Sequence, residues 1–117
     1  MQHHFEDKIL SVTVPGDILS TNAEELRSDL VALLQSPQGT QGQCATLRLD
    51  LTRARMIDSV GLNLLVTFIR FMKERGGKVQ AVVTNPNIER TFIFTRLDQM
   101  LEVIKPSTTL PSPTSRS

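Results

Sequence analysis

The chain has 117 residues, of which 39% are hydrophobic and 21% are charged, and its formal net charge is +1. This length suffices for one domain with one hydrophobic core, and the small net charge gives no bulk reason to expect binding to nucleic acid or to a membrane surface. The single cysteine, Cys44, cannot form an internal disulfide, and no apolar run is long enough to span a bilayer. We therefore expect a cytoplasmic protein without a membrane span.

The first half of the chain predicts a strand, a helix and a second strand. Apolar and polar residues alternate in each strand, and Pro15-Gly16-Asp17 has the composition of a turn. Thr21 or Asn22 is a suitable N-cap for the helix. In chain order we expect a leader over 1–7, a strand over 8–14, a helix that ends before Pro37, a Gly/Gln loop over 38–43 and a strand over 45–51.

The second half predicts two helices that alternate with two strands. Gly76-Gly77 is a natural stop for the first of these helices, and Asn85-Pro86-Asn87 opens the second. In chain order we expect a helix over 59–75, a strand over 78–83, a helix over 88–95 and a short last strand over 101–105.

Strands and helices that alternate along a chain are typical of an α/β fold. The predicted segments give a sheet of about four strands. These strands mostly alternate in polarity instead of being apolar throughout, so we expect helices mainly on one face of the sheet. The globular domain is predicted over residues 8–105. Residues 106–117 are rich in Pro, Ser and Thr, which predicts a disordered tail.

The sequence offers no recognisable catalytic or metal-binding constellation, so we expect no enzyme activity, no metal and no cofactor. It lacks the common phosphate-loop, nucleophile-elbow and zinc-helix motifs. The only histidines, His3 and His4, lie in the predicted leader, and Cys44 at a strand start has the character of a buried small hydrophobe.

The most informative segment is Met56-Ile57-Asp58-Ser59-Val60-Gly61-Leu62, which joins a strand to the long second helix. Asp58 and Ser59 can each cap a helix, and Gly61 permits close approach of another backbone. Ser59 has two interpretations: a simple cap, or a phosphoacceptor whose phosphate would lie at the positive end of the helix dipole. Arg53 and Arg55 give the segment a basic approach.

The second helix is apolar around most of its circumference, more than one sheet can cover. Either neighbouring helices cover the surplus, or a partner protein does. Its polar stripe is formed by Asn63, Thr67, Arg70 and Glu74, and its apolar surface by Val60, Leu62, Leu64, Leu65, Val66, Phe68, Ile69, Phe71 and Met72.

Several segments together resemble a STAS domain, and specifically a bacterial anti-sigma factor antagonist. The most specific is Ile57-Asp58-Ser59-Val60-Gly61-Leu62, because the Asp-Ser-x-Gly-Leu motif follows a strand. The resemblance covers about residues 8 to 105. Its other segments are Val14-Pro15-Gly16-Asp17-Ile18, Leu47-Arg48-Leu49-Asp50-Leu51, Gly76-Gly77 before a strand, and Ile88-Glu89-Arg90 to Leu97.

This resemblance implies a partner switch that controls sigma-dependent transcription. The antagonist would bind an anti-sigma factor that is also a serine kinase, phosphorylation of Ser59 would block that binding, and a PP2C-type phosphatase would restore it. We expect the partner to contact Asp58, Ser59, Val60, Gly61, Asn63 and Leu64. The alternative is an interaction subunit of a larger assembly or a lipid-transport complex, which would not be phosphorylated.

Overall fold

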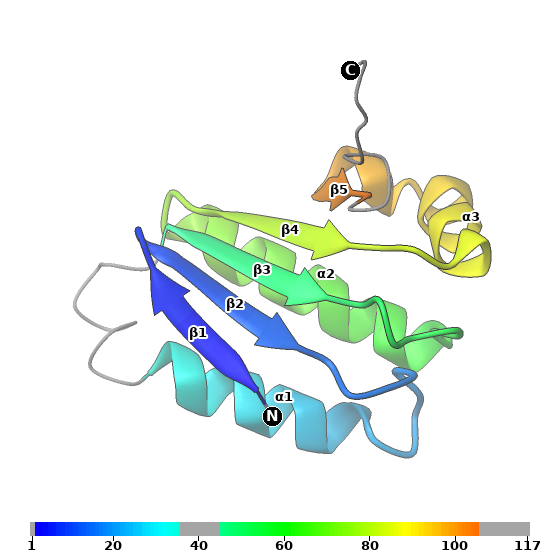
Figure 1. The fold of residues 1–117 in the computed structure, drawn as a ribbon, viewed down its shortest axis with the longest axis horizontal. Helices are drawn as coiled ribbons and strands as arrows, with labels where there is room; N and C mark the ends of the chain where they lie inside the picture. Colours follow the sequence, from blue (N-terminus) through cyan, green and yellow to red (C-terminus); the bar gives the residue numbers. More distant parts are fainter. Residues whose placement is uncertain (1, 36–44, 106–117) are drawn as a thin grey trace, which may run out of the picture.

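The computed structural model describes residues 2–35 and 45–105, and these form a five-stranded sheet with its helices (Figure 1). The predicted order of strands and helices from residue 8 onward is confirmed, and most bounds agree to within two residues. The elements are β1 (His3–Glu6), β2 (Ile9–Thr13), α1 (Ala23–Leu34), β3 (Thr46–Asp50), α2 (Ser59–Glu74), β4 (Lys78–Val82), α3 (Pro86–Thr95), the 3₁₀ helix η2 (Leu97–Gln99) and β5 (Glu102–Ile104).

The strands lie in the order β1-β2-β3-β4-β5, and the sheet is mixed. The pair β1–β2 is antiparallel, whereas the pairs β2–β3, β3–β4 and β4–β5 are parallel. Parallel neighbours need a crossover connection. Here α1 and α2 supply the crossovers from β2 to β3 and from β3 to β4, and α3 with η2 connects β4 to β5.

The segment expected as a leader contains β1, so the sheet has one strand more than the approximate four that we predicted. Asp7 and Lys8 form a two-residue turn with φ of 55° and 67°, which folds β1 back onto β2. A turn with both central residues at positive φ is the type I′ hairpin turn, which usually shows in a sequence as Asn-Gly or Asp-Gly. Asp-Lys lacks that signal, and Phe5 is the only apolar residue of β1, so its alternation is weak.

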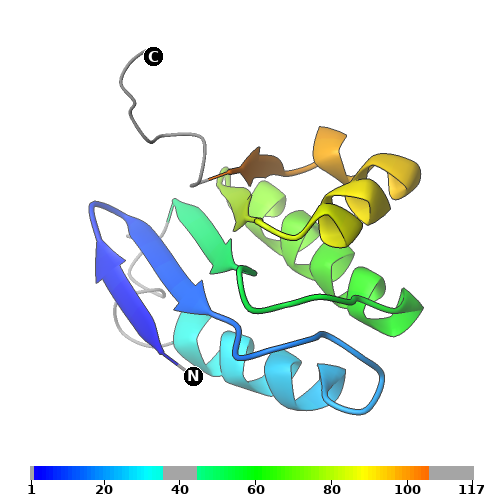
Figure 2. The same cartoon turned by 45° about the vertical axis from the view of Figure 1, so that its right-hand side comes forward.

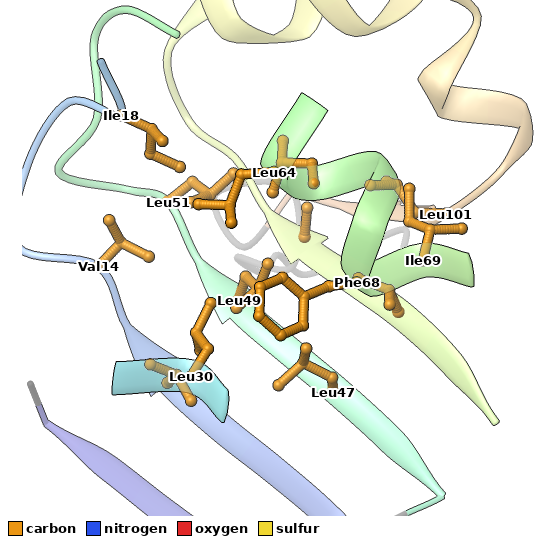
Figure 3. Close-up of a cluster of buried hydrophobic side chains, with 14 of the residues drawn as sticks. Val14, Ile18, Leu30, Leu47, Leu49, Leu51, Leu64, Phe68, Ile69 and Leu101 are labelled. Atoms are coloured by element: carbon orange, nitrogen blue, oxygen red, sulfur yellow. The ribbon is translucent and has the colours of Figure 1, made fainter. Parts of the chain in front are cut away.

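Helices α1 and α2 lie on the same face of the sheet, as both ribbon views show (Figures 1 and 2). This confirms the prediction of helices mainly on one face. The strand residues that face these helices are buried, and Leu47 and Leu49 of β3 belong to the same buried cluster as Phe68 of α2 (Figure 3). They include Leu10, Val12, Leu47, Leu49, Val79 and Ala81.

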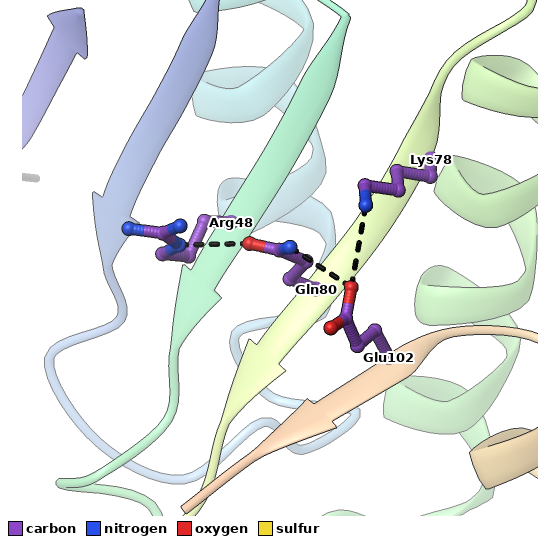
Figure 4. A network of polar contacts seen from close by, with 4 residues as sticks. All are labelled: Arg48, Lys78, Gln80 and Glu102. Carbon is purple, nitrogen blue, oxygen red and sulfur yellow. Dashed lines mark hydrogen bonds and ion pairs between the residues drawn. The ribbon is translucent and has the colours of Figure 1, made fainter. Parts of the chain in front are cut away.

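The opposite face of the sheet carries a polar network (Figure 4). Arg48 Nε donates to Gln80 Oε1 at 2.9 Å, and Gln80 Nε2 donates to Glu102 Oε1 at 2.9 Å. Lys78 Nζ lies 3.4 Å from the same carboxylate oxygen. The hydrogen bonds from Gln80 and Lys78 lower the pKa of Glu102 below its ordinary value. This polar face explains why the strands alternate in the sequence.

Three of our expectations fall on residues outside the described ranges. These are the loop over 38–43, the environment of Cys44 and the disordered tail over 106–117. They stay predictions.

Candidate functional site

Ser59 occupies the first helical position of α2, and its side chain is exposed. The residue before it, Asp58, is the N-cap: its backbone is extended, and its Oδ1 accepts a hydrogen bond from Gly61 N–H at 2.9 Å. The sequence left the cap open between Asp58 and Ser59, and the structure assigns it to Asp58. The hydroxyl of Ser59 is therefore not needed as the cap.

The second carboxylate oxygen of Asp58 reaches across to the loop before α1. Asp58 Oδ2 accepts from Ser20 N–H at 2.7 Å. The backbone N–H groups of Gly61 and then Ser20 hold the pKa of this carboxyl below its ordinary value, because they stabilise its charged form. One side chain thus both caps α2 and ties it to the Ile18–Ser20 segment.

Two backbone hydrogen bonds fix the same loop along the segment that precedes α2. Ile18 N–H donates to Met56 C=O at 3.1 Å, and Asp58 N–H donates to Ile18 C=O at 3.1 Å. Gly61 packs directly against this connection: a Cβ on Gly61 would lie 2.5 Å from Ile18 O. This confirms the expectation that Gly61 permits the close approach of another backbone.

Asp17 and Asn22 hold the loop that contains Ile18, and our sequence analysis did not identify this role. Asp17 Oδ1 accepts from Arg55 N–H at 2.7 Å and Met56 N–H at 3.2 Å. Asn22 Oδ1 accepts from Leu19 N–H at 2.8 Å, and its Nδ2 donates to Asp17 C=O at 2.8 Å. Asn22 stands at the N-cap position of α1 but makes no side-chain cap hydrogen bond there. Asp17 after Pro-Gly was visible in the sequence, but its acceptor role depends on a segment 38 residues further along.

A shallow hollow of about 270 Å³ lies between α1 and α2, and its lining includes Val60, the residue that follows Ser59. Val60, which is 45% exposed, and Asn63 contribute to its rim, and the buried Leu64 contributes to its lining. The exposed ion pair between Glu24 and Arg27 borders it on α1. The complete lining is Ser20, Ala23, Glu24, Arg27, Val60, Asn63, Leu64 and Thr67.

The residues expected to contact a partner thus divide into two groups. Ser59, Val60 and Asn63 present exposed side chains on one end of α2. Asp58 is half-buried, and Gly61 and Leu64 are buried. Asp58 and Gly61 make internal contacts that shape this surface. The exposed Arg53 and Arg55 lie in the connection between β3 and α2.

Most of the wide apolar surface of α2 is covered within the domain. Leu65, Phe68, Ile69 and Met72 are buried, and Leu62 and Val66 are half-buried against the same core. Phe71 is 37% exposed, and the guanidinium of Arg75 lies 5.1 Å from the centre of its ring. Within the domain, the apolar surface of α2 is therefore covered except at Val60, in the first turn, and at part of Phe71.

Across residues 2–35 and 45–105, no cluster of three or more His, Cys, Asp or Glu side chains has an arrangement that could hold a metal ion. No described helix combines the length and the apolar character needed to cross a membrane.

The STAS domain family model matches residues 1–110, so the chain belongs to the STAS domain family. No curated protein sequence is similar enough to count as a relative. The fold is shared with solved structures whose sequences are 17–22% identical to this one.

Three of these structures cover most of both chains. A Thermotoga maritima protein assigned as an anti-sigma factor antagonist superposes with a TM-score of 0.77 at 18% identity, covering 92% of this chain and 87% of its own. An anti-sigma factor antagonist from Mycobacterium paratuberculosis gives 0.73 at 22% identity, with 88% and 82% covered. The Bacillus cell fate determinant SpoIIAA in its phosphorylated form gives 0.65 at 17% identity, with 92% and 93% covered.

Proposed function

We propose that this STAS domain is an anti-sigma factor antagonist that is switched off by phosphorylation of Ser59. Its unphosphorylated form binds an anti-sigma factor that is also a serine kinase, and this releases a sigma factor for transcription in the cytoplasm. A PP2C-type phosphatase returns the phosphorylated form to the binding state. The proposal gives the domain no catalytic role of its own.

The observation that carries this proposal is the exposed Ser59 at the first position of α2. The first N–H groups of a helix have no intrahelical partners, and the helix dipole favours negative charge at this end. A phosphate on Ser59 is therefore compatible with the folded domain without rearrangement. The phosphorylated structure of SpoIIAA, a protein of the same fold, is consistent with such a modification.

The hollow between α1 and α2 supports the second half of the proposal, which is loss of binding. A partner that packs over Val60 and Asn63 would also approach the exposed Ser59, which directly precedes Val60 in the first turn of α2. After phosphorylation it would have to desolvate a dianion, at a cost of several kcal/mol unless it supplied a cation. A loss of about 3 kcal/mol lowers affinity more than a hundredfold.

Titration calorimetry with the cognate anti-sigma factor tests the proposal. We expect Ser59→Ala to bind like the unphosphorylated wild type, the phosphorylated protein to bind at least a hundredfold more weakly, and Ser59→Asp to lie between them. Ser28→Asp on the exposed side of α1 is the matched control, because it adds the same charge away from the start of α2. Incubation with the kinase should phosphorylate the wild type and leave Ser59→Ala unmodified.

Circular dichroism and the melting temperature establish that the variants are folded. Since Asp58 supplies the cap, Ser59→Ala should change stability by no more than about 0.5 kcal/mol. Equal affinities for the wild type, Ser59→Asp and the phosphorylated form would refute the switch. The hollow would then be better explained as the docking site of an interaction subunit that is not phosphorylated.

A further inference from the structure

Strand β1 forms one outer edge of the sheet, and β2 is its partner on the inner side. Thr13 N–H donates to Gln2 C=O at 2.8 Å, at the far end of the ladder from the turn. Hydrogen-bonded and non-bonded pairs alternate along an antiparallel ladder. Gln2 and Thr13 form a hydrogen-bonded pair, so the backbone groups of Gln2 point toward β2. Phe5 is three residues further along, which is an odd number, so its N–H and C=O point away from β2. The outer edge therefore presents a backbone donor and acceptor at Phe5.

This edge lacks most of the devices that normally keep edge strands from pairing. Such edges are usually protected by lysine, proline, a bulge or a covering element. The strand reads His-His-Phe-Glu, and its register with β2 is continuous over all four pairs, with no bulge. No described helix or loop extends the sheet beyond it. Its short length and the exposed charge of Glu6 are the protective features that it retains.

The side chains of β1 are complementary to a second copy of themselves. Residues that oppose each other in an antiparallel pair lie on the same face of the sheet. A twofold axis through Phe5 would pair Phe5 with Phe5 of the second copy and would place His4 opposite Glu6 of that copy. His4 and Glu6 are already matched within one chain, where Nε2 lies 2.8 Å from Oε1. In the paired edge, each carboxylate would lie between two imidazoles.

We propose that two copies of this chain associate edge to edge through β1, antiparallel about a twofold axis at Phe5. The outward N–H and C=O of the two Phe5 residues would form a reciprocal pair of hydrogen bonds, giving one continuous ten-stranded sheet. Shifting the axis to His4 would place the two His4 side chains opposite each other and leave Glu6 opposite Gln2. The hydrogen-bonding match between imidazole and carboxylate therefore selects the register at Phe5.

The contact is small and polar, so the dimer is of the weak, transient class. His4 and Glu6 side chains are both 70% exposed, and exposed pairs contribute little individually. This inference goes beyond the Ser59 switch: β1 carries none of the residues around Ser59, so either proposal can fail without the other.

Sedimentation velocity of the full chain, from low micromolar to millimolar concentration, measures this association. We expect His4→Glu to weaken it at least tenfold, because Glu6 of the second copy then faces a carboxylate. The double variant H4E/E6K replaces each imidazole–carboxylate contact with a carboxylate–ammonium contact in which the two positions are exchanged, and should return the dissociation constant to within a few-fold of wild type. Circular dichroism and melting temperatures would establish that both variants are folded.

Amide hydrogen exchange gives a readout at the backbone itself. Phe5 N–H should become protected as protein concentration rises, whereas Leu10 N–H inside the sheet should be protected at every concentration. A monomer throughout the concentration series would overturn the proposal. A dimer that His4→Glu leaves intact, or one that H4E/E6K does not restore after His4→Glu has disrupted it, would also overturn it.

Discussion

At the scale of one residue, Gly61 is required by the close packing at the start of α2. The Ile18 backbone lies so close to Gly61 that only glycine fits there, because a Cβ on residue 61 would lie 2.5 Å from Ile18 O and 2.8 Å from Ile57 Cγ2. The first of these atoms belongs to the backbone, which is held by hydrogen bonds to the segment before α2. The loop cannot move away without breaking those bonds.

Gly61→Ala should therefore destabilise the domain by about 1–3 kcal/mol, the usual cost of overpacking. This loss has to exceed the gain of about 0.5–1 kcal/mol that alanine brings to a helix. Gly16→Ala is the matched control, because a Cβ there meets nothing within 4 Å. Urea unfolding monitored by circular dichroism measures both. Equal stability of the two variants would show that the loop can yield at Ile18.

Asp58 makes the stability of the same region depend on pH. Its pKa lies below the ordinary value of 3.8 in the folded state, because Gly61 and Ser20 N–H groups stabilise the carboxylate. This contribution is complete at pH values above the unfolded pKa, and is lost as the pH falls through the lower folded pKa. Glu24 and Glu102 have lowered pKa values as well and add to the same trend.

We expect Asp58→Asn to be less stable than wild type at pH 6, with a difference that narrows below about pH 4. Asparagine can still accept one hydrogen bond as a cap, but it cannot accept from Gly61 and Ser20 with two carboxylate oxygens. Urea unfolding of both proteins at several pH values measures this. A difference that stayed constant to pH 3 would contradict the assigned cause.

At the scale of elements, the β1–β2 hairpin depends on an unfavourable pair of turn residues. Asp7 and Lys8 both have positive φ, at 55° and 67°. Aspartate tolerates this conformation better than lysine, which has no short polar group to compensate. The turn is retained because it brings β1 onto β2 and Phe5 against the core.

Lys8→Gly should stabilise the domain by about 1 kcal/mol, since glycine adopts positive φ without steric cost. Lys73→Gly, at an exposed position in the last turn of α2, is the matched control and should lose about 1 kcal/mol. Chemical denaturation of the two variants shows whether each substitution raises or lowers the free energy of unfolding. Destabilisation by Lys8→Gly would mean that the turn is not in this conformation in solution.

At the scale of the whole molecule, the two faces of the sheet have different roles, since one is covered by helices and the other carries a polar network. The face toward α1 and α2 supplies the core, and the connections at the ends of β2 and β3 build the surface around Ser59. Strand β1 extends this sheet and contributes the half-buried Phe5 to the core.

Deleting residues 1–7 should lower the free energy of unfolding by about 1–2 kcal/mol, because the partial burial of Phe5 is lost with β1. Phe5→Ala, which keeps the strand, separates the side-chain contribution from that of the backbone ladder. Thermal and urea unfolding would be compared with the full chain. Unchanged stability would support the original interpretation of the segment as a leader.

The local pattern of the sequence was enough to predict the α/β fold and the order of its elements after residue 7. Alternation of apolar and polar residues indicates a half-buried strand. Gly76, which has φ of 76° just after α2, ends that helix as predicted. The Asp58-Ser59 pair placed a polar cap at the start of a long apolar helix. These features depend on residues close together in the chain, which is why they can be predicted without the structure.

Tertiary structure alone decided how the surface around Ser59 is built. Asp17 bonds to Arg55 N–H and Asp58 bonds to Ser20 N–H, each across 38 residues of sequence. No local pattern encodes such a pairing, because it exists only once β2 and β3 pair in parallel and bring together the loops that follow them. The same holds for β1, whose one apolar residue gives a weak signal and which becomes a strand because the β2 edge satisfies its backbone.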